Sequence, residues 1–480
     1  MNLSAHASQH ATADARGEGR RRRVVILGGG FAGLHAARRL ERTLAHQRDL
    51  EVVLISRQNY VLFTPMLHEV AAGDLDPADI VTPLRRMLRR VRVIQAEVTE
   101  IDLQARLVRY LVGPLKRPRE LSYDHLLLAM GSETSSFGMK DVEAATATMK
   151  TLGDAALLRN RMVALLEEAA QETDEARRRR LMTFVVAGGG FAGVETVGAI
   201  NDFLRETVRY YPELDEHMLR VVLVHPGDVV LPELGERLGR YAQEKLQQRG
   251  VELRLRTRVA GYEDDAVKFV QGDPIATMSL VWTAGIMPAA ALDPLPVDRI
   301  KGRVTVNECL EVPGHGGVVW AAGDCAAVPD GNGGLHPPTA QHGMRQAIAA
   351  ARNIEAVVRR DAQKPFRFST IGQLASIGHR TGVAQILGIR FSGFVAWWLW
   401  RGVYLCKLPG FSKKLRVGIK WSFDLLFPRE IEQLVTLRDV EGMEKLSATL
   451  RAMREVSQPG GAGSDGTSPS RDRPGGVGGT

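Results

Sequence analysis

The chain has few cysteines and no long apolar run, and each absence excludes a class of function. Three cysteines occur in 480 residues, widely spaced and without a C-x-x-C pair or a metal cluster with histidines: Cys309, Cys325 and Cys406. We therefore expect neither a redox-active dithiol nor a metal site, and so sparse a count suits a reducing compartment. Charges interrupt the most apolar stretch, residues 391–408, well short of the roughly 20 residues that a membrane-spanning helix needs.

The net charge of +8 is confined to two short segments. Residues 1–23 carry +3 and residues 391–427 carry +5, so the rest of the chain is close to neutral. This distribution argues against a nucleic-acid groove along the body of the protein, and we expect no nucleic-acid partner. A hydrophobic fraction of 44% with 25% charged residues is typical of a globular chain, and the length indicates several domains.

A glycine-rich segment occurs twice, 160 positions apart. VILGGGFAGL at 25–34 returns as VVAGGGFAGV at 185–194, and a second apolar strand follows each copy, at 50–55 and 219–224. Each copy reads as a strand, a glycine-rich turn and a helix, which predicts two doubly wound nucleotide-binding domains. Apolar strands further along both halves end in a glycine, Gly131 and Gly285, which we expect to let the backbone pass close to a cofactor.

Both copies contain the G-x-G-x-x-G pattern. Its glycines are Gly28, Gly30 and Gly33 in the first copy, and Gly188, Gly190 and Gly193 in the second. They stand where a tight turn, a close pyrophosphate and helix–strand packing exclude a side chain, and the pyrophosphate then meets the N-terminus of the following helix.

The acidic residue that usually binds the ribose is missing at the end of both second strands. Ser56 takes its place in the first unit, followed by Arg57, and His225 takes it in the second. No arginine follows His225 before Arg237, which favours NAD over NADP.

Two dinucleotide sites without a dithiol indicate a flavin in one domain and a nicotinamide in the other. Gly323 and Asp324 follow the expected strand 318–322, where a carboxylate could bind the ribityl chain of a flavin. The alternative for Asp324 is an ordinary helix N-cap.

Residues 24 to about 435 resemble the type II NADH dehydrogenases, single-subunit NADH:quinone oxidoreductases of the two-dinucleotide-binding flavoprotein superfamily. The supporting segments are GGGFAGL at 28–34, NYVLFTPMLHEVAAG at 59–73, GSETSSFG at 131–138, GGGFAGVE at 188–195, WTAGI at 282–286, AAGDC at 321–325 and AQHGMRQA at 340–347. The glycine motifs are widespread, whereas the FTP and AQ segments and the basic, aromatic C-terminus are more specific to this family.

The resemblance implies FAD on the first domain, NADH on the second, and a quinone as electron acceptor. It implies FAD contacts at Gly28, Gly30, Gly33, Asp324 and Gln341, and NADH contacts at Gly188, Gly190, Gly193 and Glu195. Other expected cofactor contacts are Phe31, Ala32, Ser56, Arg57, Thr64, Gly131, His225, Gly285 and Gly323.

Three residues are expected to take part in catalysis by positioning the reactants. Glu195 matches a carboxylate near the nicotinamide, and its alternative is a solvent-facing helix residue. Gln341 and Gln346 match a family pattern beside the flavin that borders the quinone pocket, whereas Arg345 replaces the usual uncharged neighbour.

The C-terminal segment has an unusual composition. Residues 391–427 hold ten of the 28 aromatic residues, including Trp397, Trp398, Trp400 and Trp421, together with six basic residues. Aromatic rings and lysines favour the membrane interface. We expect two short helices, separated near Pro409, that lie in the membrane plane; the alternative is a core-packed pair whose aromatic rings are buried.

The predicted fold class is α/β, with two Rossmann-like domains, the second inserted in the first, and C-terminal amphipathic helices that associate with the membrane. The expected parts are a disordered tail (1–23), an FAD domain in two pieces (24–150 and 305–390), an NADH domain (151–304), membrane-associating helices (391–456) and a second disordered tail (457–480). We expect a peripheral protein on the cytoplasmic face of the cell membrane, and the sequence leaves open a homodimer.

Three other functions share this architecture. A sulfide:quinone reductase needs a reactive cysteine pair around the flavin, and no cysteine precedes Cys309. A soluble ferredoxin or rubredoxin reductase would not explain the C-terminal composition. A membrane-associated redox-sensing flavoprotein with little turnover is the third alternative.

Overall fold

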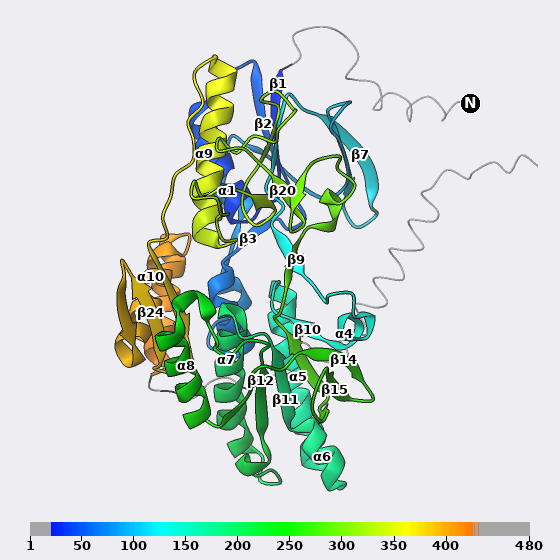
Figure 1. Cartoon of the computed structure of the whole chain (residues 1–480), viewed down its shortest axis with the longest axis vertical. Helices are drawn as coiled ribbons and strands as arrows, with labels where there is room; N and C mark the ends of the chain where they lie inside the picture. Colours follow the sequence, from blue (N-terminus) through cyan, green and yellow to red (C-terminus); the bar gives the residue numbers. More distant parts are fainter. Residues whose placement is uncertain (1–20, 426, 428–430, 432–480) are drawn as a thin grey trace, which may run out of the picture.

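The computed structural model describes residues 21–425, 427 and 431. Two sheets with their helices lie one beyond the other along the long axis, and a third, smaller unit packs beside the second sheet (Figure 1). The tail at 457–480 and most of the tail at 1–23 lie outside the described residues. Strand β1 (Arg22–Leu27) begins two residues before the expected boundary, because the parallel ladder already pairs Arg22 with Leu50 and Arg23 with Glu51.

The first sheet has seven strands. Its order is β21 (Val319–Ala321), β8 (His125–Leu128), β1, β2 (Leu50–Ser56), β5 (Arg92–Asp102), β6 (Leu107–Val112) and β7 (Arg117–Ser122). The first five strands are parallel, and their central members are continuous runs of buried valine, isoleucine and leucine, as strands covered on both faces require. Helices α1 (Phe31–Thr43) and α9 (Ala340–Arg359) pack against each other on this core. Because β21 and α9 return from the far end of the chain, the second domain is inserted in the first.

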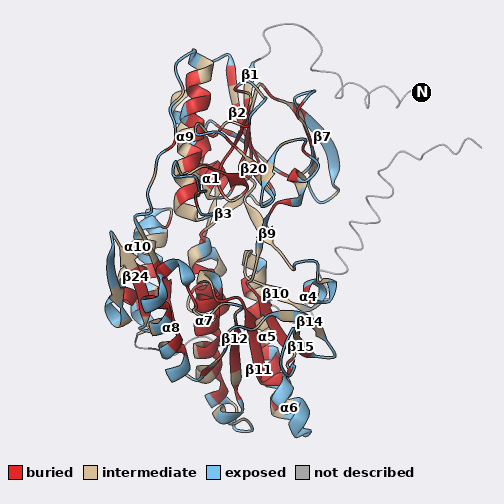
Figure 2. Cartoon of the chain, viewed as in Figure 1, coloured by how far each residue is buried: buried red, intermediate tan, exposed pale blue. Residues whose placement is uncertain are grey.

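The second sheet has five parallel strands. Its order is β10 (Ala147–Thr148), β17 (Ser279–Trp282), β11 (Thr183–Ala187), β12 (Arg220–Val224) and β13 (Val251–Arg254). Its helices are α5 (Leu152–Gln171), α6 (Glu175–Leu181), α7 (Phe191–Thr207) and α8 (Glu236–Gln248). Buried residues concentrate in these strands and on the helix faces that cover them (Figure 2).

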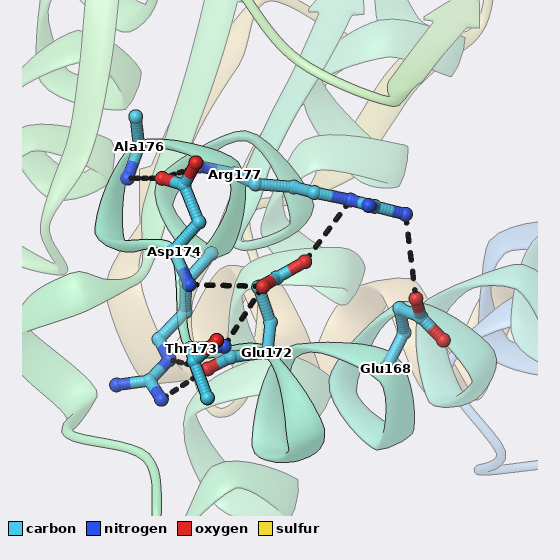
Figure 3. A network of polar contacts seen from close by, with 7 residues as sticks. Glu168, Glu172, Thr173, Asp174, Ala176 and Arg177 are labelled. Atoms are coloured by element: carbon cyan, nitrogen blue, oxygen red, sulfur yellow. Dashed lines mark hydrogen bonds and ion pairs between the residues drawn. The ribbon is translucent and has the colours of Figure 1, made fainter.

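The turn between α5 and α6 shows how the run of four arginines at 177–180 is accommodated. Asp174 caps α6 by accepting from the backbone N–H groups of Ala176 and Arg177 (Figure 3). Arg177 then pairs with Glu172 at 3.0 Å and with Glu168 at 3.6 Å. This basic run is therefore partly neutralised within its own domain.

The third unit consists of a small sheet and two helices. It comprises β23 (Gly372–Ser376), β24 (Gly382–Ile386), β25 (Ile389–Ser392), α10 (Gly393–Lys407) and α11 (Phe411–Phe423). The expected boundary at 391 is wrong, because the three antiparallel strands pair with one another and pack on α10 and α7 rather than on the first domain. None of the helices described between 21 and 425 combines the length and hydropathy of a bilayer crossing.

One segment of the first domain packs on the second. Helix α2 (Leu67–Ala71) lies against α5 and α7, and its Leu67, Val70 and Ala71 belong to the core that covers the second sheet. Strands β9 (Ser132–Thr134) and β18 (Ile286–Pro288) pair with each other and also connect the two domains. The region between the two sheets is thus built by segments of both nucleotide-binding domains.

Candidate functional site

A cavity of about 1450 Å³ occupies the region where the three units meet. It extends from the first glycine loop, past the N-terminus of α7, to the residues that connect α10 with α11. The predicted site residues that line it are Gly28, Gly30, Phe31, Ala32, Ser56, Arg57, Thr64, Gly131, Glu195, Gly285, Gly323, Asp324 and Gln341. Its volume exceeds the 300–1,000 Å³ of ordinary ligand pockets, so more than one ligand can fit.

The first glycine loop is shaped by two close approaches and one open face. A Cβ atom on Gly28 would lie 2.2 Å from the carbonyl oxygen of Ala129, and one on Gly33 would lie 1.8 Å from that of Gly28. Gly28 also has φ +105°, which favours glycine. In contrast, a Cβ on Gly30 would meet nothing within 4 Å. The loop is therefore tightly packed at Gly28 and Gly33, whereas at Gly30 the N-terminus of α1 is accessible.

The second glycine loop repeats this geometry. Gly188 has φ +119°, a Cβ on Gly193 would lie 1.7 Å from the carbonyl oxygen of Gly188, and a Cβ on Gly190 would meet nothing within 4 Å. These three glycines do not line the large cavity; they lie at its margin, at the start of α7, whose Phe191 and Glu195 do line it.

His225 contacts the loop rather than open space. Its Nδ1 accepts a hydrogen bond from the N–H of Gly189 at 3.1 Å, and a Cβ on Gly189 would lie 2.5 Å from the ring. Burial lowers the pKa of His225, so the ring is neutral at pH 7. This histidine supports the glycine loop from below, which sequence position alone did not indicate.

Other predicted contacts differ in how they meet the cavity. Ser56 packs under the first loop, because a Cβ on Gly29 would lie 2.5 Å from its Oγ, and Arg57 pairs with Glu133 at 3.3 Å. Gly131, with φ +70°, has open space where a side chain would stand. Gly285 does not, because a Cβ there would lie 2.6 Å from the ring of Phe137.

Asp324 is held from two sides at the wall of the cavity. Its Oδ2 accepts from the hydroxyl of Ser132 at 2.9 Å. The preceding N–H, that of Gly323, donates to Oε1 of Gln346 at 3.0 Å. Gln346 is itself buried and does not line the cavity, so it supports the Gly323–Asp324 turn from behind instead of bordering the open space as predicted.

Gln341 faces the cavity from the first turn of α9. Its Nε2 donates to the carbonyl oxygen of Gly372 at 3.1 Å, which connects the first domain to the third unit. Arg345, the unusual neighbour, stacks on Phe368 with its guanidinium carbon 4.2 Å from the ring centre. Its charge is thus directed onto an aromatic face.

Glu195 is buried rather than solvent-facing. Its Oε1 accepts from the indole N–H of Trp400 at 3.0 Å and from the N–H of Ser376 at 3.2 Å. Burial raises the pKa of Glu195 to about 8, and these two hydrogen bonds oppose that rise. His68 approaches the other oxygen at 3.8 Å, but burial lowers its pKa to about 3 and keeps the imidazole neutral. At pH 7 the site therefore presents a protonated carboxyl to the cavity.

A second buried carboxyl, Glu69, was not identified from the sequence. It follows His68 on α2, accepts from the indole N–H of Trp421 at 3.1 Å, and has a pKa raised to about 8 by burial, an effect that Arg401 opposes. The only signal was the L-H-E sequence within the family-specific segment at 59–73. The Trp421 partner is 352 positions away, which no local pattern could reveal.

The tryptophans of the C-terminal helices correct the interfacial prediction. Trp397, Trp400 and Trp421 are buried, and only Trp398 is exposed, at 51%. Arg401 is also buried, with its guanidinium carbon 4.0 Å from the ring centre of Trp397 and 4.8 Å from that of Trp421. For these residues the core-packed alternative is correct, because the indole N–H groups of Trp400 and Trp421 donate to buried carboxyls and Arg401 stacks on Trp397.

A different set of residues forms the exposed apolar face of the two helices. Phe411, Leu415, Ile419 and Phe423 stand four residues apart on α11 and are all exposed, and Phe394, Val395 and Trp398 are exposed on α10. Such spacing puts side chains on one side of a helix. We call these seven residues the C-terminal apolar face. Several neighbouring cations turn to the body, since Lys413 donates to the carbonyl oxygen of Ala78 and Lys420 pairs with Asp79 at 3.0 Å.

The first glycine loop and the Asp324 turn fit FAD. The open face at Gly30 gives a pyrophosphate access to the free N–H groups of α1, and Asp324 offers a carboxylate to a hydroxylated chain on the same wall. Of the three cysteines, only Cys406 lines the cavity; Cys325 is buried behind it, and burial raises the pKa of its thiol to about 11.

Comparisons with known proteins agree with this geometry. The family model for pyridine nucleotide-disulphide oxidoreductases matches residues 22–353, and the model for the NDH2 C-terminal domain matches residues 371–430, which includes β23 to β25. The chain is 33% identical over 435 residues to the type II NADH:quinone oxidoreductase Ndh of Mycobacterium tuberculosis, a match that covers 87% of this chain and 91% of that protein. It is 28% identical to the type II NADH:quinone oxidoreductase of Staphylococcus aureus, over 78% and 92% of the two chains.

A solved structure has the same overall fold as this chain. NDH2 from Plasmodium falciparum, in complex with NADH, superposes with a TM-score of 0.78 at 19% identity, over 86% of this chain and all of that chain. The fold class predicted from the sequence is thereby confirmed. The chain belongs to the pyridine nucleotide-disulphide oxidoreductase family and, within it, to the type II NADH:quinone oxidoreductases.

Proposed function

We infer that the protein oxidises NADH and reduces a quinone with FAD as its cofactor. The observation that carries this conclusion is the single cavity that connects the first glycine loop, the start of α7 and the α10–α11 junction. The glycine loop of the second domain offers a binding surface for NADH, which arrives from water. The cavity also extends to the C-terminal apolar face, from which a lipid-dissolved quinone could enter. FAD, when bound, supplies the two-electron relay between donor and acceptor.

The role of the chain is to hold the reactants and to supply a proton. Reduction of a quinone by NADH consumes one proton from solution for each NADH, because the quinone takes up two electrons and two protons to become the quinol, whereas the hydride from NADH carries two electrons and only one proton. We propose that Glu195 holds that proton at its carboxyl, since its pKa is raised to about 8 by burial. Gln341 would keep the third unit in register with the flavin domain through its bond to Gly372.

We further propose that the C-terminal apolar face inserts into the surface of a membrane. Seven exposed apolar residues on two adjacent helices form an amphipathic surface of the kind that lies in the lipid interface. Lys407 and Lys414 line the cavity together with Phe411, a residue of this face, so the cavity extends to the surface proposed to meet the lipid. On this proposal the protein is peripheral on the cytoplasmic face of the membrane. The homodimer stays a prediction, which sedimentation of the flavin-loaded protein would test.

The test is spectroscopic. Purified protein should show the absorption of bound FAD, lose it on anaerobic addition of NADH, and regain it on addition of a soluble quinone, with steady NADH oxidation in the presence of both. Bleaching by NADH without quinone-dependent recovery would favour the redox-sensing alternative. Recovery with ferredoxin or rubredoxin but not with quinone would favour the soluble reductase.

A further inference from the structure

A chain of two hydrogen bonds links the NADH domain to the turn at Asp324. Nζ of Lys150 donates to Oγ of Ser132 at 2.9 Å, and Oγ of Ser132 donates to Oδ2 of Asp324 at 2.9 Å. A hydroxyl has one proton and an ammonium cannot accept, so the direction of both bonds is fixed. All three residues line the cavity.

The three residues come from different parts of the fold. Lys150 lies between β10 of the second sheet and α5, Ser132 begins the connecting strand β9, and Asp324 follows β21 of the first sheet. The lysine therefore reaches across the boundary between the domains. Its side chain is the link between the sheet that carries the second glycine loop and the carboxylate on the first.

The loop that carries Lys150 is tightly held. Oδ2 of Asp154 accepts from the N–H groups of Lys150 and Thr151, both at 2.9 Å, and from the hydroxyl of Thr148 at 2.6 Å. Oγ1 of Thr151 in turn accepts from the N–H of Asp154, which completes a capping box at the start of α5. The backbone at 150 is thus fixed, which reduces the entropy lost when the ammonium binds a partner.

The ammonium group of Lys150 has more N–H donors than Ser132 uses. It carries three protons and Ser132 accepts one, so the same group can also donate into the cavity that it lines. Charged groups near Lys150 at this wall are Asp324 itself and the Arg57–Glu133 pair, and Arg303, which does not line the cavity, interacts electrostatically with Asp324. An anionic or electron-accepting group placed beside Asp324 would therefore face Lys150 as well.

We propose that Lys150 is a further residue of the flavin site, which orients Asp324 through Ser132 and stabilises the negative charge of reduced FAD. This inference rests on FAD binding in the proposed function, but it does not require the quinone. Two-electron reduction makes the flavin more negative, and a nearby cation in a water-poor site stabilises the more negative form. Lys150 thus raises the reduction potential of the flavin and helps to retain it.

The test measures FAD retention and the midpoint potential of the bound flavin, neither of which depends on turnover. Lys150→Gln should bind FAD several-fold more weakly and shift the midpoint potential downward. Lys150→Arg keeps the charge and should restore most of the potential. Ser132→Ala frees Asp324 but keeps the ammonium, so it should lose FAD affinity with a smaller change in potential. Lys364→Gln, an exposed lysine on a loop, is the matched control.

Defined outcomes would overturn the proposal. Lys150→Gln with wild-type retention and potential would exclude any action of Lys150 on the flavin. Equal losses of affinity in Lys150→Gln and Ser132→Ala, without a shift in potential in either, would exclude the electrostatic role. If the wild-type protein bound no FAD, the proposed function would fail first; if it bound FAD but did not reduce quinone, these measurements would still decide the role of Lys150.

Discussion

The indole N–H of Trp400 donates to the carboxyl of Glu195 at 3.0 Å, across 205 positions of sequence. A parallel bond joins Trp421 to Glu69 at 3.1 Å. Each C-terminal helix therefore sends one tryptophan to one buried carboxyl of the body, and the third unit forms part of the wall of the cavity. Deletion of everything from Phe391 onward would release the protein from a membrane, but it would also remove a hydrogen-bond partner of Glu195. Point substitutions are the cleaner experiments.

Trp400→Phe should raise the pKa of Glu195 above its value of about 8. The indole N–H stabilises the ionised carboxylate, so its loss favours the protonated form; a bond to a charged group is worth about 1.5–3 kcal/mol, or about 1–2 pH units. If protonated Glu195 supplies the proton, activity falls as the pH rises through this pKa, and the variant should keep activity to higher pH. The pH profile of kcat/KM for quinone measures this shift.

The exposed Trp398 provides the control for that experiment. Trp398→Phe should leave the alkaline limb of the profile in place. A shift of the limb to lower pH in Trp400→Phe, or an equal shift in both variants, would contradict the assignment.

Glu69 should make the folded state less stable as the pH rises. Burial raises its pKa from the ordinary 4.5 to about 8, so the folded protein holds a proton that the unfolded chain releases. The stabilisation is complete below pH 4.5 and is lost as the pH rises through about 8. Glu69→Gln cannot ionise, and its unfolding midpoint in urea should fall less than that of the wild type between pH 6 and pH 9.

Exposed Glu168→Gln is the matched control, because this carboxyl lies on the surface of α5. Its unfolding midpoint should follow the wild type across the pH range. If Glu69→Gln did the same, Glu69 would not be a protonated group in the folded protein.

Gly30→Val and Gly190→Val should separate the two nucleotide sites. A Cβ at either position meets nothing within 4 Å, and neither glycine has a positive φ, so both variants should fold. The valine in the first loop would occupy the approach of a pyrophosphate and should abolish flavin absorbance. The valine in the second loop should leave the flavin in place and raise KM for NADH several-fold. Equal loss of flavin in both variants would show that the domain assignment is wrong.

Gln346→Leu should weaken the Asp324 turn without touching the cavity. The buried N–H of Gly323 would lose its acceptor, which costs about 1–3 kcal/mol. We expect a lower melting temperature and faster release of FAD, measured by fluorescence of the freed flavin. Gln247→Leu on the exposed side of α8 is the control. Unchanged FAD release in Gln346→Leu would mean that the turn is held without this side chain.

Local constraints made part of this molecule predictable. The glycine loops could be located because nearby backbone leaves no room for a side chain at several of these positions. A Cβ on Gly33, for example, would lie 1.8 Å from the carbonyl oxygen of Gly28. The two nucleotide-binding domains followed from the repeat of the same unit. The packing of α2 on the second domain and the assignment of β23 to β25 to the third unit could not be predicted, because they depend on surfaces that meet only in the folded chain.

The same reason explains the errors in the C-terminal segment. Its aromatic and basic composition predicts a membrane surface equally well for every tryptophan, whereas the fold buries Trp397, Trp400 and Trp421 against partners from the body. The residues that remain exposed, such as Phe411 at 82%, could be separated from the buried ones only by the helix orientation. Composition therefore identified the segment that could contact a membrane, but only the packed structure shows which of its residues are exposed.

Leu415→Glu with Ile419→Glu should release the protein from lipid vesicles while leaving flavin absorbance and NADH-dependent bleaching intact, because neither side chain lines the cavity. Both side chains are exposed on the C-terminal apolar face, where a charge opposes insertion into lipid. Co-sedimentation with vesicles that contain anionic lipid measures the loss, and activity with a soluble quinone should persist. Val270→Glu, an exposed residue that follows strand β15 (Ala266–Phe269) in the second domain, should sediment like the wild type. If the double variant still sedimented with vesicles, the membrane would contact another surface.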